Sequence, residues 1–275
     1  MRQTMQQPTE VATAIRNLDS RISLHGVSLV VRGEGAPVFL MHGIGGNASS
    51  CGALAQLLSE AGHRTFCWDA PGYGESADPR GPVDHSGLVL QILASLAVGP
   101  AHLIGTSWGG VIATKAAAQA PDAVRSLVLA DSTRGSAVTG DSADRMLARI
   151  PELAAMGPEA FAGRRASRLL SPAADAVTAA AVRSEMAAVR LPGYTAAATM
   201  MAATDTSDVL PSLQVPSLVL VGEDDVVTGV AESRVLAESI PNASLEVIPR
   251  AGHAAVQEKP AEMASSILEF WKGLS

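Results

Sequence analysis

Short apolar runs alternate with helix-length segments along most of the chain. The apolar runs predict a pair of strands over 21–31 and single strands at 37–41, 64–68, 101–106, 125–130, 217–221 and 245–248. Helices are predicted over 50–61, 84–97, 108–119, 229–240 and 261–271. This alternation indicates an α/β fold with a mostly parallel sheet covered by helices on both faces. Ligands of such sheets bind at the carboxyl ends of the strands.

The alternation is interrupted between residues 136 and 210, where no strand-like run occurs. Alanine makes up 21 of these 75 residues, and prolines at four positions divide the segment. A structureless insertion of this length is uncommon in a compact domain. We therefore expect a helical cap over 136–210, inserted into a core made of 21–135 and 211–275, with residues 1–20 as an N-terminal extension.

Composition excludes several kinds of partner. The 275 residues carry a net charge of -7, and only 3% of them are aromatic, which argues against a nucleic-acid binder. Residues 1–20 contain no apolar run long enough for a signal peptide or a membrane span. Two cysteines, Cys51 and Cys67, have no metal-binding spacing and are expected to be reduced. We expect a cytoplasmic protein with no nucleic-acid or membrane partner.

A Gly-x-Ser-x-Gly pattern, Gly105-Thr106-Ser107-Trp108-Gly109, lies where a predicted strand runs into a predicted helix. Glycines on both sides let the backbone turn sharply and leave space around an exposed serine oxygen. The plainer alternative is that Ser107 only caps the helix. A serine hydroxyl becomes a good nucleophile when a base takes its proton, so a histidine should lie nearby.

His253 is the only histidine in the second half of the chain, and the other five precede Ser107. It follows the last predicted strand in a loop that contains Gly252, which places its ring within reach of the strand ends. An acid is needed to fix the tautomer of this histidine and to stabilise its charged form. Asp225, just after the preceding strand, is our choice for it, and Asp224 and Asp131 are the alternatives.

The glycine-rich loop His42-Gly43-Ile44-Gly45-Gly46 follows the first buried strand. Glycines there allow backbone N–H groups to point at a reacting oxygen. The N–H groups of Ile44 and Trp108 are the predicted oxyanion hole, since Trp108 follows the nucleophile at a helix N-terminus. We interpret His42 as a structural residue held under the loop by hydrogen bonds.

At these motifs the sequence resembles the α/β-hydrolase superfamily, and within it bacterial esterases and 3-oxoadipate enol-lactonases. The resemblance implies an eight-stranded, mostly parallel sheet, a Ser107-His253-Asp225 triad and a lid over the pocket. It favours Asp225 as the acid, because the turn of these proteins follows the pattern Gly-x-x-Asp from Gly222. One departure is Gly229, where the relatives usually have proline. The likeness is carried by the loops at 42–46, 69–76, 105–109, 222–225 and 251–253.

These observations predict a serine hydrolase that cleaves a small or medium-sized carboxylic ester or lactone. The same groups could also serve a C–C bond hydrolase acting on a diketone. A third possibility is a non-hydrolytic protein that binds a ligand or acts as a lyase or cyclase. No metal is expected, because the histidines are scattered, and no organic cofactor, because a dinucleotide glycine pattern is missing.

The cap should supply the substrate contacts. Its methionines and few aromatics suit an apolar group, and Met146 and Tyr194 are the candidates we name. The cap also holds seven arginines and no lysine. Arg190 is our candidate for binding a substrate carboxylate, because a planar bidentate donor suits that task. The alternative is that Arg190 is a solvated arginine at a helix end.

Overall fold

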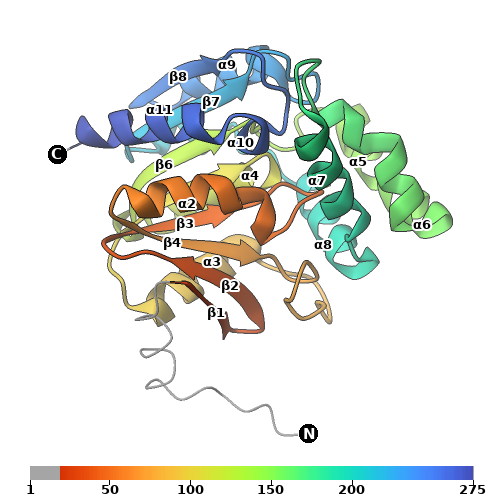
Figure 1. Cartoon of the computed structure of the whole chain (residues 1–275), viewed down its shortest axis with the longest axis horizontal. Helices are drawn as coiled ribbons and strands as arrows, with labels where there is room; N and C mark the ends of the chain where they lie inside the picture. Colours follow the sequence, from red (N-terminus) through yellow and green to blue (C-terminus); the bar gives the residue numbers. More distant parts are fainter. Residues whose placement is uncertain (1–18, 275) are drawn as a thin grey trace, which may run out of the picture.

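The computed structural model describes residues 19–274, which form an eight-stranded sheet with helices on both faces (Figure 1). Along the sheet the strands follow the order β1-β2-β4-β3-β5-β6-β7-β8. β1 pairs antiparallel with β2 and β2 with β4, whereas all other neighbours are parallel. The strands are β1 (Asp19–Leu24), β2 (Val27–Arg32), β3 (Ala36–Met41), β4 (His63–Asp69), β5 (Ala101–Thr106), β6 (Val124–Ala130), β7 (Ser217–Gly222) and β8 (Ala243–Ile248).

The predicted mostly parallel sheet of eight strands is confirmed. Its central strands are buried from end to end, since all residues of β5 and β7 are buried. This explains why the two strands are mostly apolar and do not alternate regularly between apolar and polar residues. The extension expected over residues 1–20 lies outside the described residues, except for its last two, which begin β1.

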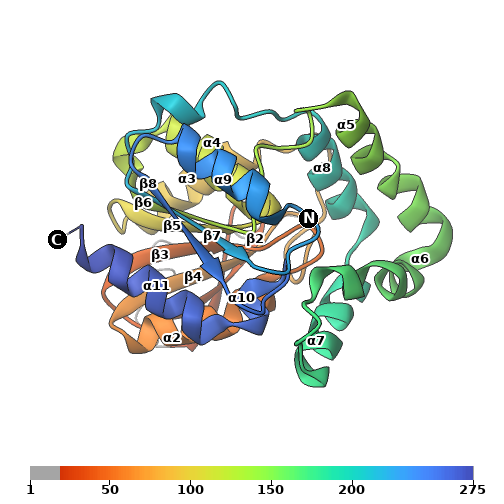
Figure 2. The ribbon, with the colours of Figure 1, turned by 90° about the horizontal axis from the view of Figure 1, so that it is seen from above.

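Helices cover the sheet in two layers (Figure 2). One layer consists of α2 (Gly52–Glu60), α10 (Ala255–Glu258) and α11 (Pro260–Lys272). The opposite layer consists of α3 (His85–Leu96), α4 (Trp108–Gln119) and α9 (Gly229–Ser239). Each layer packs against one face of the sheet and buries an apolar core there. Both cysteines are buried and unbridged.

Between β6 and β7 the chain leaves the sheet and forms helices at its carboxyl edge (Figures 1 and 2). We call residues 136–210 the cap. Its helices are α5 (Gly140–Leu147), α6 (Arg149–Arg165), the short 3-10 helix η3 (Ala166–Leu169), α7 (Ala176–Ala187) and α8 (Leu191–Ala202). Gly157, with φ +76°, kinks α6 just before Pro158, so the two halves of this helix point in different directions.

At two glycines the backbone of the cap lies in direct contact with the backbone of the core. A Cβ atom at Gly72 would lie 2.3 Å from Cα of Gly193, and one at Gly193 would lie 2.4 Å from the carbonyl oxygen of Gly72. The first turn of α8 therefore lies directly on the loop after β4, with backbone against backbone. Only glycine permits this approach at both positions.

The loops that matter for chemistry all leave the same edge of the sheet. They follow β3, β5, β6, β7 and β8, whose parallel pairing brings their carboxyl ends together. Among residues 19–274, no helix is both long enough and apolar enough to cross a membrane.

Candidate active site

Ser107 occupies a strained turn between β5 and α4. Its φ of 53° and ψ of -115° lie where residues with a Cβ atom are rarely found. The flanking glycines are required by close packing, because a Cβ atom at Gly105 would lie 2.3 Å from the carbonyl oxygen of Gly109. One at Gly109 would lie 2.2 Å from the carbonyl oxygen of Met41. The tight turn lifts the serine side chain to the edge of the sheet.

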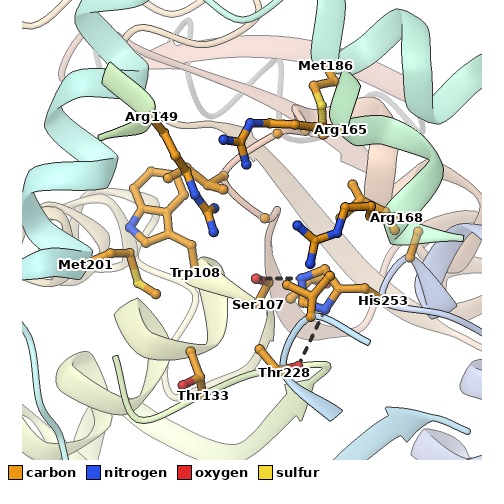
Figure 3. A pocket seen from close by; sticks show the side chains of 18 of the residues that line it. Ser107, Trp108, Thr133, Arg149, Arg165, Arg168, Met186, Met201, Thr228 and His253 are labelled. Carbon is orange, nitrogen blue, oxygen red and sulfur yellow. Dashed lines mark hydrogen bonds between the residues drawn. The ribbon is translucent and has the colours of Figure 1, made fainter. Parts of the chain in front are cut away.

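Ser107, His253 and Asp225 form a chain of two hydrogen bonds. Nε2 of His253 lies 2.9 Å from Oγ of Ser107, and Nδ1 of the same ring lies 3.0 Å from Oδ2 of Asp225 (Figure 3 draws the bond to Ser107). The Asp225 and His253 side chains are 0% and 8% exposed. With a proton on Nδ1 bound by the carboxylate, Nε2 is free to accept the serine proton. This arrangement can activate a hydroxyl for attack on a carbonyl.

Asp225 is held by several donors besides the histidine. Its Oδ1 accepts from the N–H groups of Val227 and Thr228, at 2.7 and 3.2 Å, and Oδ2 accepts from the Thr228 hydroxyl at 2.6 Å. Burial alone would raise the pKa of Asp225, but the hydrogen bond and charge of His253 and these donors together hold the pKa well below its usual range. Asp225 is therefore charged at neutral pH.

Thr228 is a site residue that sequence reasoning missed. Its hydroxyl reaches Asp225 and lies 3.5 Å from Nδ1 of His253 (Figure 3). Residue type and spacing gave no signal for this role. The next residue, Gly229, has φ +79°, a left-handed conformation that proline cannot adopt.

The two alternative acids lie elsewhere. Asp131 follows β6 and is fully buried, and its Oδ1 accepts from the N–H of Gly222 at 2.8 Å. Burial and the nearby charge of Asp225 raise its pKa well above the usual range, which favours the neutral carboxyl. Asp224 binds through its backbone, its N–H donating to the carbonyl oxygen of Ala251. Of the three acids, only Asp225 contacts His253.

The loop after β3 lies against the serine. A Cβ atom at Gly43 would be 3.4 Å from Cβ of Ser107, and Ile44 and Trp108 line the same cavity as Ser107. Tyr73 holds this loop by donating its hydroxyl to the carbonyl oxygen of Ile44 over 3.0 Å. Trp108 is the first residue of α4, so no carbonyl of that helix can accept its N–H. Both predicted oxyanion-hole residues therefore lie beside Ser107.

His42 lies beneath this loop. Its Nε2 accepts from the N–H of Ala70 at 3.1 Å, which leaves the proton on Nδ1, and this nitrogen donates to the carbonyl oxygen of Gly43 at 2.7 Å. Burial lowers the pKa of His42 to about 4, so the ring is neutral at physiological pH. These bonds tie the glycine-rich loop to the loop after β4.

A cavity of about 450 Å³ lies between the cap and the sheet edge, above Ser107. Met146 and Tyr194, both named from the sequence, line it, as do Met186 and Met201. No group of three or more histidine, cysteine or acidic side chains within residues 19–274 is arranged to hold a metal ion.

Arg190, the third substrate contact named from the sequence, is not among the residues lining this cavity. Its guanidinium binds the loop after β4, donating to Asp78 Oδ1 and to the carbonyl oxygens of Gly74 and Ser76 at 2.6 to 2.7 Å. The reason is its place as the residue before α8, which directs its side chain toward the core loop. Arg190 joins the cap to the core, and the solvated alternative does not describe it either.

Other arginines line the cavity instead. Figure 3 shows Arg149, Arg165 and Arg168 with their guanidinium groups directed into the space above Ser107. Arg149 begins α6, Arg165 ends it, and Arg168 lies in η3. Their positions depend on the kink in α6, which the sequence alone did not place. The signal available was the composition of the cap, with seven arginines and no lysine.

The chain is similar to known proteins in sequence and in fold. RutD of Variovorax paradoxus, provisionally named a carbamate hydrolase, is 30% identical over 246 residues that cover 86% of this chain and 92% of that protein. 3-Oxoadipate enol-lactonase 2 of Acinetobacter baylyi is 28% identical over 71% of this chain and 73% of its own. A malate-bound thermophilic esterase from Thermogutta terrifontis superimposes with a TM-score of 0.84 at 25% identity, covering 94% and 99% of the two chains.

The family model described as the alpha/beta hydrolase fold matches residues 36–260. The match runs from β3 to the start of α11 and so includes Ser107, Asp225 and His253. The resemblance inferred from the loop motifs is thereby confirmed, and hydrolases are among the similar proteins. The chain belongs to the alpha/beta hydrolase fold family.

Proposed function

We propose that this protein is a serine hydrolase that cleaves a small or medium-sized carboxylic ester or lactone through an acyl-enzyme. The observation that carries the proposal is the pair of hydrogen bonds from Ser107 to His253 and from His253 to Asp225, at 2.9 and 3.0 Å. A partly exposed serine next to a buried histidine and a buried carboxylate, in this order, supplies the groups that acyl transfer to water requires.

The reaction begins when Oγ of Ser107 attacks the substrate carbonyl and His253 takes its proton on Nε2. The N–H groups of Ile44 and Trp108 stabilise the oxygen anion of the tetrahedral intermediate. His253 then returns the proton to the departing alkoxide, which leaves an ester on Ser107. Water, activated by the same histidine, releases the acid. Asp225 keeps the ring oriented and stabilises its positive charge throughout.

Esters and lactones are favoured by two further observations. Similar proteins include an esterase and an enol-lactonase, both named for cleavage of an acyl–oxygen bond. The cavity also offers apolar surface from Met146, Met186 and Met201, which suits a hydrocarbon chain next to the carbonyl.

The decisive experiment compares the protein with its Ser107→Ala variant on a chain-length series of nitrophenyl esters and lactones. The variant should lose more than about a thousandfold of kcat, because it lacks the hydroxyl that Nε2 of His253 contacts. A fluorophosphonate should label Ser107 and no other serine, as read by peptide mass. An Ala variant that keeps most of its ester hydrolysis would contradict the proposal. Turnover of a carbon-linked diketone with little ester hydrolysis would favour the C–C hydrolase.

A further inference from the structure

The cavity above Ser107 is lined by more positive than negative charge, although the protein as a whole is acidic. Of the described residues that line it, four are arginines and two are glutamates. The chain carries a net charge of -7, so this local excess is not part of a generally basic surface. Arg149, Arg165 and Arg168, which we call the arginine cluster, point toward the serine (Figure 3).

The two glutamates do not neutralise this cluster, because each has other partners. Both carboxylate oxygens of Glu232 bind the guanidinium of Arg134, at 3.0 and 2.9 Å. Glu185 accepts from the Ser50 hydroxyl at 2.6 Å and from the side-chain amide of Gln257 at 3.1 Å. Glu232 is thus neutralised by Arg134 and Glu185 is held by neutral donors, and neither forms an ion pair with the arginine cluster.

Within the cluster, Arg165 is fixed and the other two arginines lack an acid. Arg165 forms an ion pair with Glu152 and stacks on the ring of Phe161, with Cζ 4.9 Å from the ring centre. Among residues 19–274, neither Arg149 nor Arg168 has a carboxylate within ion-pairing distance. Two guanidinium groups that face a cavity without a counter-charge can each offer paired N–H donors to a ligand.

We infer that the substrate carries a carboxylate at the end remote from the scissile carbonyl, and that Arg149 and Arg168 bind it. This inference rests on the proposed ester or lactone hydrolysis and specifies its substrate as a half-ester or lactone of a dicarboxylic acid. One carboxylate has two oxygens, one for each guanidinium that lacks an acidic partner, and the methionines that line the same cavity accommodate the linking methylenes. Arg165 keeps its ion pair with Glu152 and attracts the substrate carboxylate from a longer distance.

The test uses matched pairs of methyl esters: monomethyl glutarate and adipate against the corresponding esters whose free acid is replaced by a carboxamide. The protein should hydrolyse each anionic ester with a kcat/KM at least about tenfold above that of its neutral partner. Arg149→Gln and Arg168→Gln should each lower this ratio by about tenfold, chiefly by raising the KM of the anionic ester. Arg183→Gln is the control, because Arg183 is an exposed cap arginine outside the cavity, and it should not change the ratio.

A second measurement separates the possible failures. Glutarate should inhibit hydrolysis of the neutral ester competitively, and this inhibition should weaken about tenfold in Arg168→Gln, whereas inorganic phosphate should inhibit far less. Equal turnover of anionic and neutral esters, with ratios unaffected by the arginine variants, overturns the carboxylate inference and leaves the hydrolase proposal standing. Stronger inhibition by phosphate than by glutarate also overturns it. Failure to hydrolyse either ester, together with no labelling of Ser107 by a fluorophosphonate, overturns the hydrolase proposal itself.

Discussion

Thr228 donates its hydroxyl to Oδ2 of Asp225 over 2.6 Å, the same carboxylate oxygen that Nδ1 of His253 faces at 3.0 Å. The threonine therefore acts on the histidine through the carboxylate, as a positioning residue. It limits the rotation of the Asp225 side chain and supports its negative charge.

Replacing Thr228 by valine should lower kcat about tenfold with little change in KM, because the carboxylate loses a donor while the cavity keeps its shape. Thr228→Ser keeps the hydroxyl and is expected to retain most of the activity. Steady-state kinetics on one nitrophenyl ester gives kcat and KM for both variants. Equal losses in the two variants would mean that the methyl group matters and the hydroxyl bond does not.

Asp225 and Asp131 provide a direct comparison of two acids at neighbouring strand ends. Asp225→Asn should lower kcat by at least about a thousandfold, because an amide cannot stabilise the charged histidine. Asp131→Asn should stay within about threefold of the unchanged protein. Asparagine resembles the neutral carboxyl favoured by the raised pKa of Asp131, and it tolerates the φ of 47° found there. The opposite ranking of the two variants would assign the acid to Asp131.

Acid should destabilise the fold through its buried histidines. Burial lowers the pKa of His42, His85 and His102 to about 4, against about 6.5 in the unfolded chain. The unfolded state therefore takes up protons first, so the free energy of unfolding decreases as the pH falls from about 6.5 toward 4. Each histidine contributes a slope of up to about 1.4 kcal/mol per pH unit.

His85→Leu isolates one of these contributions. Neither ring nitrogen of His85 has a partner among the described residues, so leucine removes a titrating group and leaves no broken hydrogen bond. Urea unfolding at pH 7.5 and 5.5 should show a smaller loss of stability in the variant than in the unchanged protein. The same pH dependence in both proteins would rule out His85 as a contributor.

Arg190 should contribute to stability and not to the choice of substrate. Its three hydrogen bonds join the cap to the loop after β4, and two of them end on backbone carbonyl oxygens. Arg190→Ala should lower the free energy of unfolding by roughly 1 to 2 kcal/mol and leave the preference for anionic over neutral esters unchanged. Thermal unfolding and the matched esters measure the two effects. A selective loss of the anionic ester would place Arg190 in substrate binding after all.

The sequence was informative where a function depends on local geometry. Ser107 was identified because a sharp turn needs glycines at fixed offsets, and the packing around Gly105 and Gly109 shows why. β5 was predicted at its observed bounds, because a strand buried on both faces is mostly apolar and lacks the alternation of a half-exposed strand. The helix predicted from residue 50 begins instead as a 3-10 turn at Ala48, since Asn47 caps it.

The directions of the arginine side chains in the cap could not be predicted from the sequence, because they depend on how distant segments pack. Arg190 and Arg149 are the same residue type in the same alanine-rich segment, yet one binds the core loop and the other faces the cavity. Arg149 begins α6 above the cavity, whereas Arg190 precedes α8, whose first turn lies on the loop after β4. Neither of these helix positions is marked by a periodic pattern in the sequence.

The contact between Gly72 and Gly193 links two segments that any exchange of parts would have to move together. A cap taken from a relative with a side chain at the second position would collide with the backbone of the loop after β4. The same loop carries Tyr73, whose hydroxyl holds the Ile44 peptide, so the collision would be transmitted to the groups around Ser107. A chimeric protein with a new specificity should therefore import residues 69–78 along with its cap.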